Sequence, residues 1–312
     1  MKITTSIRLF SILSLLLLSL WGCTDNTVTE TVTETVTETV PETVTETVPE
    51  KVTVLSVPQL SVQLWSVKNE VKADFKGTLQ ALANMGFKGV EFAGEFGEFS
   101  ENPTGLKSLL DELGLQVSGA HVHFDKLSDD NLAKTVAFYQ AIGCTSLIVP
   151  FDERAFSPVG VHQVVNELNT LSEELAKVGM QIGYHNHAQE FNGFEQSTYW
   201  DFIAQNTHQN VILQLDVGWV TFAGMDPVEY VRRYPERTLT THYKVRLPEG
   251  TKGKLPIIGQ DTIDWPALIQ ANIEVGGTRW LVVEQEEYPN GLTPMQAVEM
   301  SKKGLDTYLL KP

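Results

Sequence analysis

Cysteine is scarce in this chain, which has only two among 312 residues, Cys23 and Cys144. Cys23 lies at the end of the apolar N-terminal run and is expected to be consumed by processing, as argued below. Cys144 then has no partner, so an intramolecular disulfide is excluded. It stands in the apolar stretch GCTSLIVPF, and we expect it to be buried as a small hydrophobic residue.

Basic residues are also few. The chain has 23 Lys and Arg against 39 Asp and Glu, which gives a net charge of −16. Seven negative charges fall on residues 25–50, and two positive charges fall on residues 1–8. The remaining part therefore carries −11, and such a surface is unsuited to phosphate backbones, which need clustered Lys and Arg. Nucleic acid is excluded as a partner.

A membrane-spanning segment is missing as well. The longest apolar run, LFSILSLLLLSLWG at residues 9–22, is shorter than the ~20 residues that a span needs. Lys2 and Arg8 precede it, which is typical of an export signal. The ending LWGC resembles a bacterial lipobox, with Trp21 where a small residue is usual. We expect residues 1–23 to be a lipoprotein signal peptide with Cys23 lipidated; an uncleaved signal anchor is the alternative.

Residues 24–52 contain a repeat without core-forming residues. Six tetrads, TVTE or TVPE, fill residues 27–50 and contain no aromatic residue or leucine. β-branched residues disfavour helix, proline disfavours a regular ladder, and the repeated glutamates repel one another. We expect a disordered linker, or stalk, that holds the rest of the chain away from a lipid anchor. The protein is thus predicted in the cell envelope, facing the periplasm or the cell surface, with membrane contact only through the lipid.

Residues 53–312 alternate short β-rich runs with helical ones. Eight strand–helix units in about 250 residues are typical of a (β/α)₈ TIM barrel, within the α/β class. A doubly wound open sheet is the alternative, but no glycine-rich phosphate or dinucleotide loop follows the first expected strand. The expected strands lie in residues 59–67, 88–94, 115–124, 145–151, 180–187, 211–218, 239–248 and 279–289.

Polar residues occur where these strands end, beside apolar runs that would otherwise be core. In a barrel of this kind chemistry is located at the carboxyl ends of the strands. Six strands would bring imidazoles or carboxylates to one rim, a mixture that suits Mn²⁺, Zn²⁺, Co²⁺ or Fe²⁺, with Mg²⁺ less favoured. The residues are Glu91, His121, His123, His185, His187, Glu190, Asp216, His242, Lys244 and Glu284.

Five motifs in order, GYHNHAQEF, LQLDVGWVTFAG, THYK, GQDTIDWPALI and WLVVEQEE, resemble the sugar phosphate isomerase/epimerase group of the xylose-isomerase-like barrels. GVEFAG and GLQVSGAHV match its second and third strands, and the likeness covers residues 58–310. The resemblance implies one divalent metal ion at the barrel mouth and a sugar bound through two oxygens. The positions that match the family's ligands are His185, Asp216, His242 and Glu284.

Two features of the fifth and seventh strands depart from the family pattern. Many relatives have glutamate where this chain has His185, so Glu190 is the alternative ligand from this strand. Val245 replaces an aspartate that often follows Lys244. On a strand, His185 and His187 share a face, so one can bind metal while the other contacts substrate or moves a proton. The expected catalytic residues are His187, Glu190, Glu284 and Lys244, and the expected substrate contacts are Glu91, His121, His123 and Trp219.

The reaction expected from these groups begins at a carbon beside a carbonyl. Loss of a proton gives an enediolate that a metal ion stabilises, and return of the proton completes an isomerisation or epimerisation. A lyase or dehydratase that eliminates beside the keto group of a 3-keto-glycoside or inosose is the alternative, and a catalytically silent sugar-binding lipoprotein is a third. An exported protein points to an unphosphorylated carbohydrate. The oligomeric state is not predicted.

Overall fold

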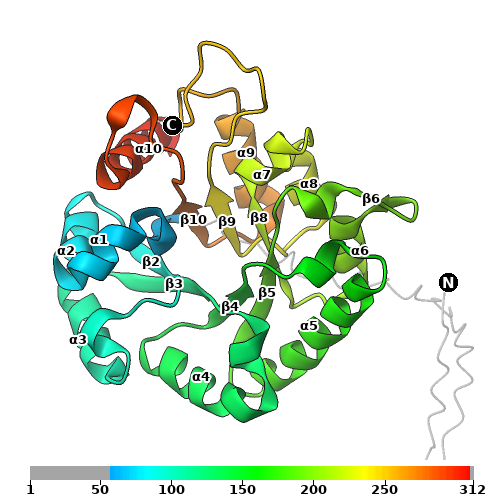
Figure 1. Ribbon diagram of the computed structural model, residues 1–312, viewed down its shortest axis with the longest axis horizontal. Coiled ribbons are helices and arrows are strands. Elements are labelled where there is room, and N and C mark those ends of the chain that lie inside the picture. Colours follow the sequence, from blue (N-terminus) through cyan, green and yellow to red (C-terminus); the bar gives the residue numbers. More distant parts are fainter. Residues whose placement is uncertain (1–56, 310–312) are drawn as a thin grey trace, which may run out of the picture. The chain divides into compact units, whose positions relative to one another are not determined.

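Eight parallel strands close into a barrel in the computed structural model, which describes residues 57–309 (Figure 1). The order around the barrel is β1-β10-β9-β8-β5-β4-β3-β2, and β1 closes it by pairing with both β2 and β10. The predicted (β/α)₈ fold is confirmed. The strands are β1 Gln59–Gln63, β2 Gly89–Phe92, β3 Gln116–His121, β4 Ser146–Val149, β5 Gln181–His185, β8 Ile212–Asp216, β9 Thr240–Tyr243 and β10 Trp280–Val283.

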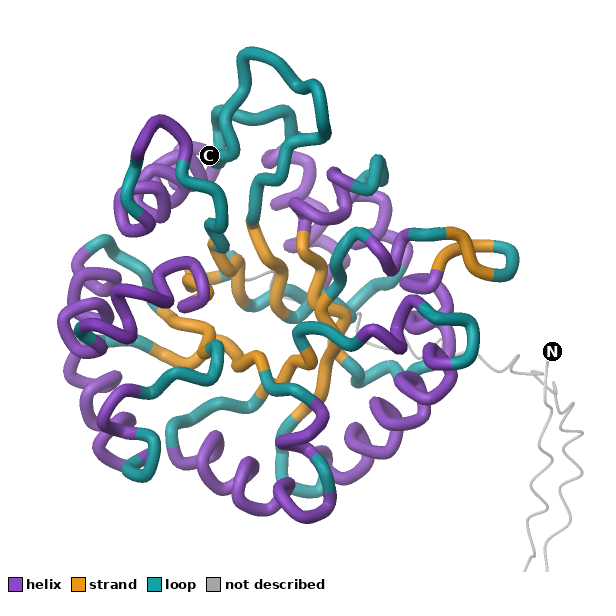
Figure 2. The backbone as a smooth tube through the Cα atoms, viewed as in Figure 1, coloured by secondary structure: helices purple, strands orange, loops and turns teal. Residues whose placement is uncertain are grey.

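Helices surround this barrel and alternate with its strands (Figure 2). Helix α3, Pro103–Leu113, shows how local sequence sets the helix boundaries. The Asn102 side chain accepts a hydrogen bond from Gly105 N at 3.0 Å, Pro103 is the first helical residue, and Gly114 ends the helix at φ 66°. The α-helices are α1 Lys68–Ala73, α2 Phe75–Asn84, α3 Pro103–Leu113, α4 Asp129–Ala141, α5 Gly160–Ala176, α6 Tyr199–Asn206, α7 Val217–Phe222, α8 Pro227–Arg233, α9 Trp265–Ala271 and α10 Pro294–Leu309.

Shorter elements complete the loops at the strand ends. A two-stranded hairpin, β6 Gly193–Phe194 with β7 Ser197–Thr198, lies between β5 and α6 and was not predicted. A π-helical turn, η6 Asn272–Gly276, continues α9. The 3₁₀ turns are η1 Leu64–Val67, η2 Gly97–Phe99, η3 Phe124–Leu127, η4 Glu153–Phe156, η5 Gln189–Phe191 and η7 Pro289–Gly291.

The strands are apolar on both faces because side chains fill the barrel inside and helices cover it outside. Every residue of β2, β4, β8 and β9 is buried, including the polar ones at their carboxyl ends. Cys144, just before β4, is a free buried thiol, as expected. Within residues 57–309 no helix is both long and apolar enough to cross a membrane. The expectations for residues 1–23 and 24–52, including Cys23, lie outside the described residues.

Candidate metal and substrate site

A cavity of about 850 Å³ opens at the carboxyl ends of the strands. Strand-end side chains from β3, β5, β9 and β10 line its floor, which is where a barrel of this kind carries its chemistry. The floor residues are His121, His185, His187, Lys244, Glu284 and Glu286. The sequence predicted all of them except Glu286.

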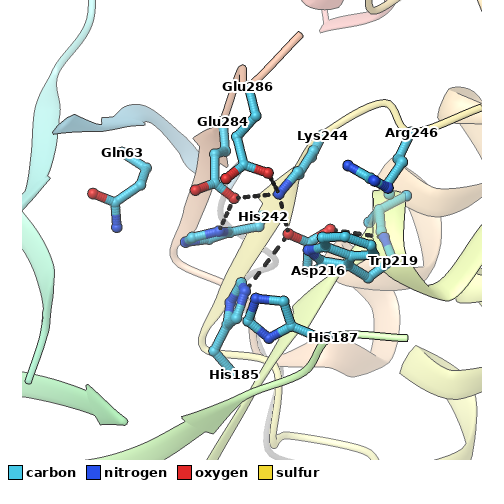
Figure 3. A network of polar contacts seen from close by, with 12 residues as sticks. Gln63, His185, His187, Asp216, Trp219, His242, Lys244, Arg246, Glu284 and Glu286 are labelled. Carbon is cyan, nitrogen blue, oxygen red and sulfur yellow. Dashed lines mark hydrogen bonds and ion pairs between the residues drawn. The ribbon is translucent and has the colours of Figure 1, made fainter. Parts of the chain in front are cut away.

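Four buried side chains at this floor bring their donor atoms within 4.8 Å of one another: His185, Asp216, His242 and Glu284. His185 Nε2 lies 3.6 Å from Asp216 Oδ2, and His242 Nδ1 lies 3.1 Å from Glu284 Oε2 (Figure 3). His185 and Asp216 are the last residues of β5 and β8, His242 is in β9, and Glu284 follows β10. These are the four residues that the sequence offered as metal ligands.

The two carboxylate oxygens of Asp216 make different contacts. Oδ1 accepts a hydrogen bond from Trp219 N at 3.0 Å and so caps α7, while Asn186 fixes the backbone by accepting from Asp216 N at 2.9 Å. Oδ2 is buried and has no hydrogen-bond partner among residues 57–309, although the Lys244 ammonium faces it at 3.4 Å. A buried carboxylate oxygen without a donor is costly unless a cation faces it, and Lys244 shares its charge with other carboxylates.

Glu91 orients the cluster from below. Its Oε1 lies 2.6 Å from His242 Nε2 and accepts from Gln63 Nε2 at 2.7 Å, and its Oε2 accepts from Gln214 Nε2 at 2.8 Å. Gly119 leaves room for it, since a Cβ there would lie 3.0 Å from Oε2. The side chain is fully buried and does not line the cavity. Glu91 therefore positions His242, and the predicted direct contact with substrate does not fit its place.

Burial and neighbouring charges shift the pKa values of the cluster residues in different directions. Burial opposes a charge on His242, but Glu91 and Glu284 outweigh it and raise the pKa of His242 to about 10. Burial raises the pKa of Asp216 to about 7, whereas Lys244 and His242 hold the pKa of Glu284 well below its usual range despite burial. Burial also lowers the pKa of His185, so its imidazole is neutral. Neutral imidazole is the form that binds a metal ion, so His185 is ready to bind one, whereas His242 would first release its Nδ1 proton.

Lys244 joins the carboxylates of the floor. Its Nζ lies 3.3 Å from Glu284 Oε2 and 3.4 Å from Asp216 Oδ2, and it also pairs with Glu286. These three carboxylates raise the pKa of Lys244 although burial opposes its charge. The lysine balances only part of the negative charge, because Glu91 adds a fourth carboxylate to the same network.

These donors fit a divalent cation. Metal–nitrogen and metal–oxygen bonds of roughly 2.0–2.2 Å place neighbouring ligand atoms some 3–4 Å apart, which agrees with the 3.1 and 3.6 Å separations in the cluster. His242 would bind through Nδ1 while Nε2–H donates to Glu91, and His185 would bind through Nε2 while Nδ1–H donates to Gln214 Oε1 at 3.1 Å. Such outer partners fix the ring orientation of ligating histidines.

The alternative ligand from the fifth strand lies elsewhere. Glu190 is fully buried and absent from the cavity lining. Its oxygens accept hydrogen bonds from the Tyr184 hydroxyl at 2.8 Å and from His187 N at 2.9 Å. Glu190 therefore fixes the turn after β5. Its expected role in catalysis is not supported by this position, and His185 is the residue that reaches the cluster.

The other predicted residues lie at different distances from the floor. His121 lines the cavity with its ring stacked 5.2 Å from that of His242, and His123 is exposed at the rim. His187 lines the cavity, and its Nδ1 is buried without a hydrogen-bond partner in the described part of the chain. Burial lowers the pKa of His187 to about 4. Trp219 does not line the cavity: Arg246 covers its ring at 4.0 Å.

Sequence reasoning missed Gln63, Gln214 and Glu286. Gln214 stands two residues before Asp216, so both face the barrel interior, and a polar residue inside an apolar strand is the signal that could have revealed it. Gln63 gives the same signal in β1. Glu286 was visible only as part of the acidic cluster EQEE, which is equally typical of a solvated surface.

Comparisons with known proteins agree with this fold. A sequence-based family model, "Xylose isomerase-like TIM barrel", matches residues 79–308. An inosose dehydratase from Lacticaseibacillus casei is 25% identical over 275 residues, which cover 76% of this chain and 91% of the relative. A sugar phosphate isomerase/epimerase structure from Parabacteroides distasonis superposes with a TM-score of 0.65 at 24% identity, covering 81% of this chain and 99% of the other.

An L-ribulose 3-epimerase structure superposes with a TM-score of 0.57 at 16% identity, covering 81% of this chain and 96% of the other. At such identities the structural matches bear on the fold. The family model, in contrast, spans most of the described barrel, including the strands that carry all four cluster residues. The chain belongs to the xylose isomerase-like TIM barrel family.

Proposed function

We propose that this barrel is a divalent-metal-dependent enzyme that removes a proton from the carbon beside a carbonyl group of a polyhydroxy ketone. The observation that carries the proposal is the buried cluster of His185, Asp216, His242 and Glu284 directly beneath a cavity of about 850 Å³. Such a cavity is near the top of the roughly 300–1,000 Å³ range of small-molecule sites. When bound, a divalent ion would stabilise the negative charge that develops on the carbonyl oxygen.

The floor supplies an acid–base group and a cation. His187 lines the cavity outside the cluster, and its buried Nδ1 has no hydrogen-bond partner among residues 57–309. We therefore propose that His187 accepts the proton removed from carbon. Lys244 reaches the cavity with a stable positive charge and would hold an oxygen of the substrate. Glu286, which follows β10 and lines the cavity, would donate a proton to the substrate or accept one from it.

Of the two fates of the enediolate, elimination has the better support. The 25% identical relative, which this chain matches over 91% of the relative's length, is an inosose dehydratase. The isomerase and epimerase resemblances concern the fold. In elimination, the C–H bond breaks with its proton passing to His187. The electron pair forms a C=C bond, the next C–O bond breaks, and the leaving oxygen takes a proton.

Isomerisation or epimerisation is the second candidate. It requires a proton to return to a different atom or face of the substrate. The cavity has acid–base groups from two separate strand ends, His187 after β5 and Glu286 after β10. With one group on each of two strand ends, a proton could be removed by one group and returned by the other, as epimerisation requires.

The substrate we propose carries no phosphate. Three lysines line the cavity, and each is within 4.0 Å of a carboxylate: Lys126 of Asp125, Lys134 of Glu101, and Lys244 of Glu286. No further cation is left over among the lining residues to neutralise a phosphate. Export as a lipoprotein through Cys23 remains our proposal and agrees with this, since sugar phosphates are kept inside cells.

Product analysis by NMR in D₂O tests the function. The purified protein is incubated with inososes, keto-sugars and 3-keto-glycosides, with and without a chelator. Elimination gives an unsaturated ketone, and epimerisation gives a deuterated stereoisomer. We expect elimination that the chelator abolishes and that His187→Ala reduces by about 10²–10⁴-fold while metal content is retained. Binding without deuterium exchange on the whole panel would instead indicate a silent sugar-binding protein.

A further inference from the structure

The cavity extends beyond the catalytic floor to a second, aromatic wall. Phe96, in the loop after β2, and Phe138 and Tyr139, on α4, line the same cavity as His187 and Glu284. Phe96 and Phe138 are half-buried, so part of each ring faces the open space. The volume of about 850 Å³ exceeds what one sugar ring over the floor would fill.

The rings of this wall brace one another. Phe96 packs edge-to-face against Phe138 with centroids 4.7 Å apart and against Tyr139 at 6.1 Å, and Phe92 supports it from the barrel at 5.1 Å. Edge-to-face packing fixes ring positions and leaves an apolar surface of defined shape. An apolar wall held in this way suits a flat hydrophobic group.

Several polar side chains around the wall are already engaged with the protein, whereas the Tyr139 hydroxyl makes no hydrogen bond to any of residues 57–309. Asn131 Nδ2 donates to Asp125 O at 2.8 Å, and Thr135 Oγ1 donates to Lys126 O at 2.7 Å. Lys134 pairs with Glu101. A second sugar ring needs unclaimed donors and acceptors for its hydroxyls, since a site that leaves them unpaired loses affinity. The single free hydroxyl of Tyr139 cannot pair with the several hydroxyls of a second sugar ring, so the wall favours an aromatic group.

We propose that Phe96, Phe138 and Tyr139 form a subsite for the aromatic substituent of a keto-glycoside whose sugar ring lies over the catalytic floor. This rests on the proposed function and names its substrate class. In the elimination, the proton leaves the sugar carbon beside the carbonyl and the glycosidic C–O bond breaks. The substituent departs as a phenol, with the electron pair and a proton on its oxygen, and the sugar becomes an unsaturated ketone.

Kinetics with paired substrates test the subsite. The protein is given 4-nitrophenyl and methyl 3-keto-β-D-glucopyranoside, and kcat/KM is measured for each in the wild type and in Phe138→Leu. We expect Phe138→Leu to lower the aryl-to-methyl ratio of kcat/KM by roughly three- to tenfold, the scale of one aromatic contact. The aryl substrate has the better leaving group in every protein. This advantage enters each ratio equally, so it does not affect the comparison of the variant with the wild type. Phe202→Leu, on α6 and outside the cavity, is the matched control and should leave the ratio unchanged.

Binding measured without turnover separates this inference from the proposed function. Phenyl and methyl β-D-glucopyranoside are titrated by NMR into the wild type, Phe138→Leu and Phe96→Leu, each checked for a cooperative thermal transition. Phenyl-specific binding that either variant weakens supports the subsite even if no keto-glycoside reacts, in which case the proposed function fails alone. An unchanged aryl-to-methyl ratio in a protein that turns both substrates over would overturn the subsite. Equal sensitivity of 3-keto-cellobiose to Phe138→Leu would overturn the preference for an aromatic group.

Discussion

His242 is held at both ring nitrogens, with Glu91 2.6 Å from Nε2 and Glu284 3.1 Å from Nδ1. A ring fixed in this way presents one nitrogen to a metal ion and cannot rotate without breaking a buried contact. Gln214 does the same for His185, and α7 does it for Asp216 through its N-terminal amide. Three of the four cluster residues therefore have a partner that fixes their direction before a metal ion arrives.

The first prediction concerns Glu91. Glu91→Gln keeps the shape of the side chain but removes the charge that orients His242, so we expect metal affinity to fall by about 10–100-fold with little change in fold. Competition with a chelating dye measures the affinity. Glu98→Gln, an exposed surface change, is the control. Equal metal affinity in Glu91→Gln and the wild type would contradict the orienting role.

The second prediction decides the ligand from the fifth strand. His185→Ala removes a donor atom of the cluster and should yield purified protein without stoichiometric metal. Glu190→Gln should retain it, because Glu190 bonds to Tyr184 and His187 away from the cluster. Elemental analysis after dialysis gives the metal content of both. Full occupancy in His185→Ala together with loss in Glu190→Gln would reverse the assignment.

Among the elements, the regular strand–helix alternation was predictable, whereas short connecting pieces were not. All eight barrel strands lie within the residue ranges that were expected from the sequence. The helix α7 spans only six residues, VGWVTF, and exists because the Asp216 side chain caps it at the strand end. This cap is a local signal, but six residues are too few for helical periodicity to show in the sequence. The position of Glu190 outside the cavity lining depends on its hydrogen bond from the Tyr184 hydroxyl. Residue spacing alone did not reveal this contact.

The third prediction concerns the packing of α7 against β9. A Cβ on Gly218 would lie 2.9 Å from Lys244 Cγ, so Gly218→Ala must move Lys244. Small displacements of a substrate-positioning group can cost on the order of 10²-fold in rate, and we expect turnover to fall on that scale with a smaller loss of stability, about 1–3 kcal/mol. Gly193→Ala is the control, since its Cβ would meet nothing within 4 Å. Similar turnover in the two variants would contradict the prediction.

The fourth prediction concerns the contact between α6 and the end of α8. Burial opposes the charge of Asp201, but hydrogen bonds from Ser197, Tyr234, Thr198 and Arg233 outweigh it and hold the pKa of Asp201 below its ordinary value. A lowered pKa means that ionised Asp201 stabilises the fold above the ordinary carboxyl pKa. This contribution is lost as pH falls through the lower folded value.

Asp201→Asn should therefore cost about 1–3 kcal/mol at pH 7, the range for hydrogen bonds to a charged group. The difference from the wild type should shrink as the pH is lowered below 4. Thermal unfolding of both proteins across pH 3–8 measures it. Asp226→Asn serves as the control, because that residue caps α8 outside this network. A stability difference that stays constant with pH would rule out the ionised carboxylate as its source.

At the scale of the whole molecule, stability depends on the closure of the barrel. β1 is hydrogen-bonded to β2 on one side and to β10 on the other, so the first and last strands complete one ring. Residues of β1 such as Val62 and Leu64 just after it are buried in the core. The contacts that close the ring all lie within residues 57–309, and removal of β1 would open it.

The last prediction follows for the N-terminal part. Deletion of residues 1–50 keeps β1 and every described core residue, so we expect a soluble protein whose thermal transition matches that of the full chain. Deletion of residues 1–64 is the matched comparison: it removes β1, exposes the edges of β2 and β10, and should abolish the cooperative transition. Differential scanning calorimetry of both proteins gives the answer. Aggregation of the shorter deletion, with loss of its transition, would mean that the segment predicted as a signal and stalk contributes to the folded barrel.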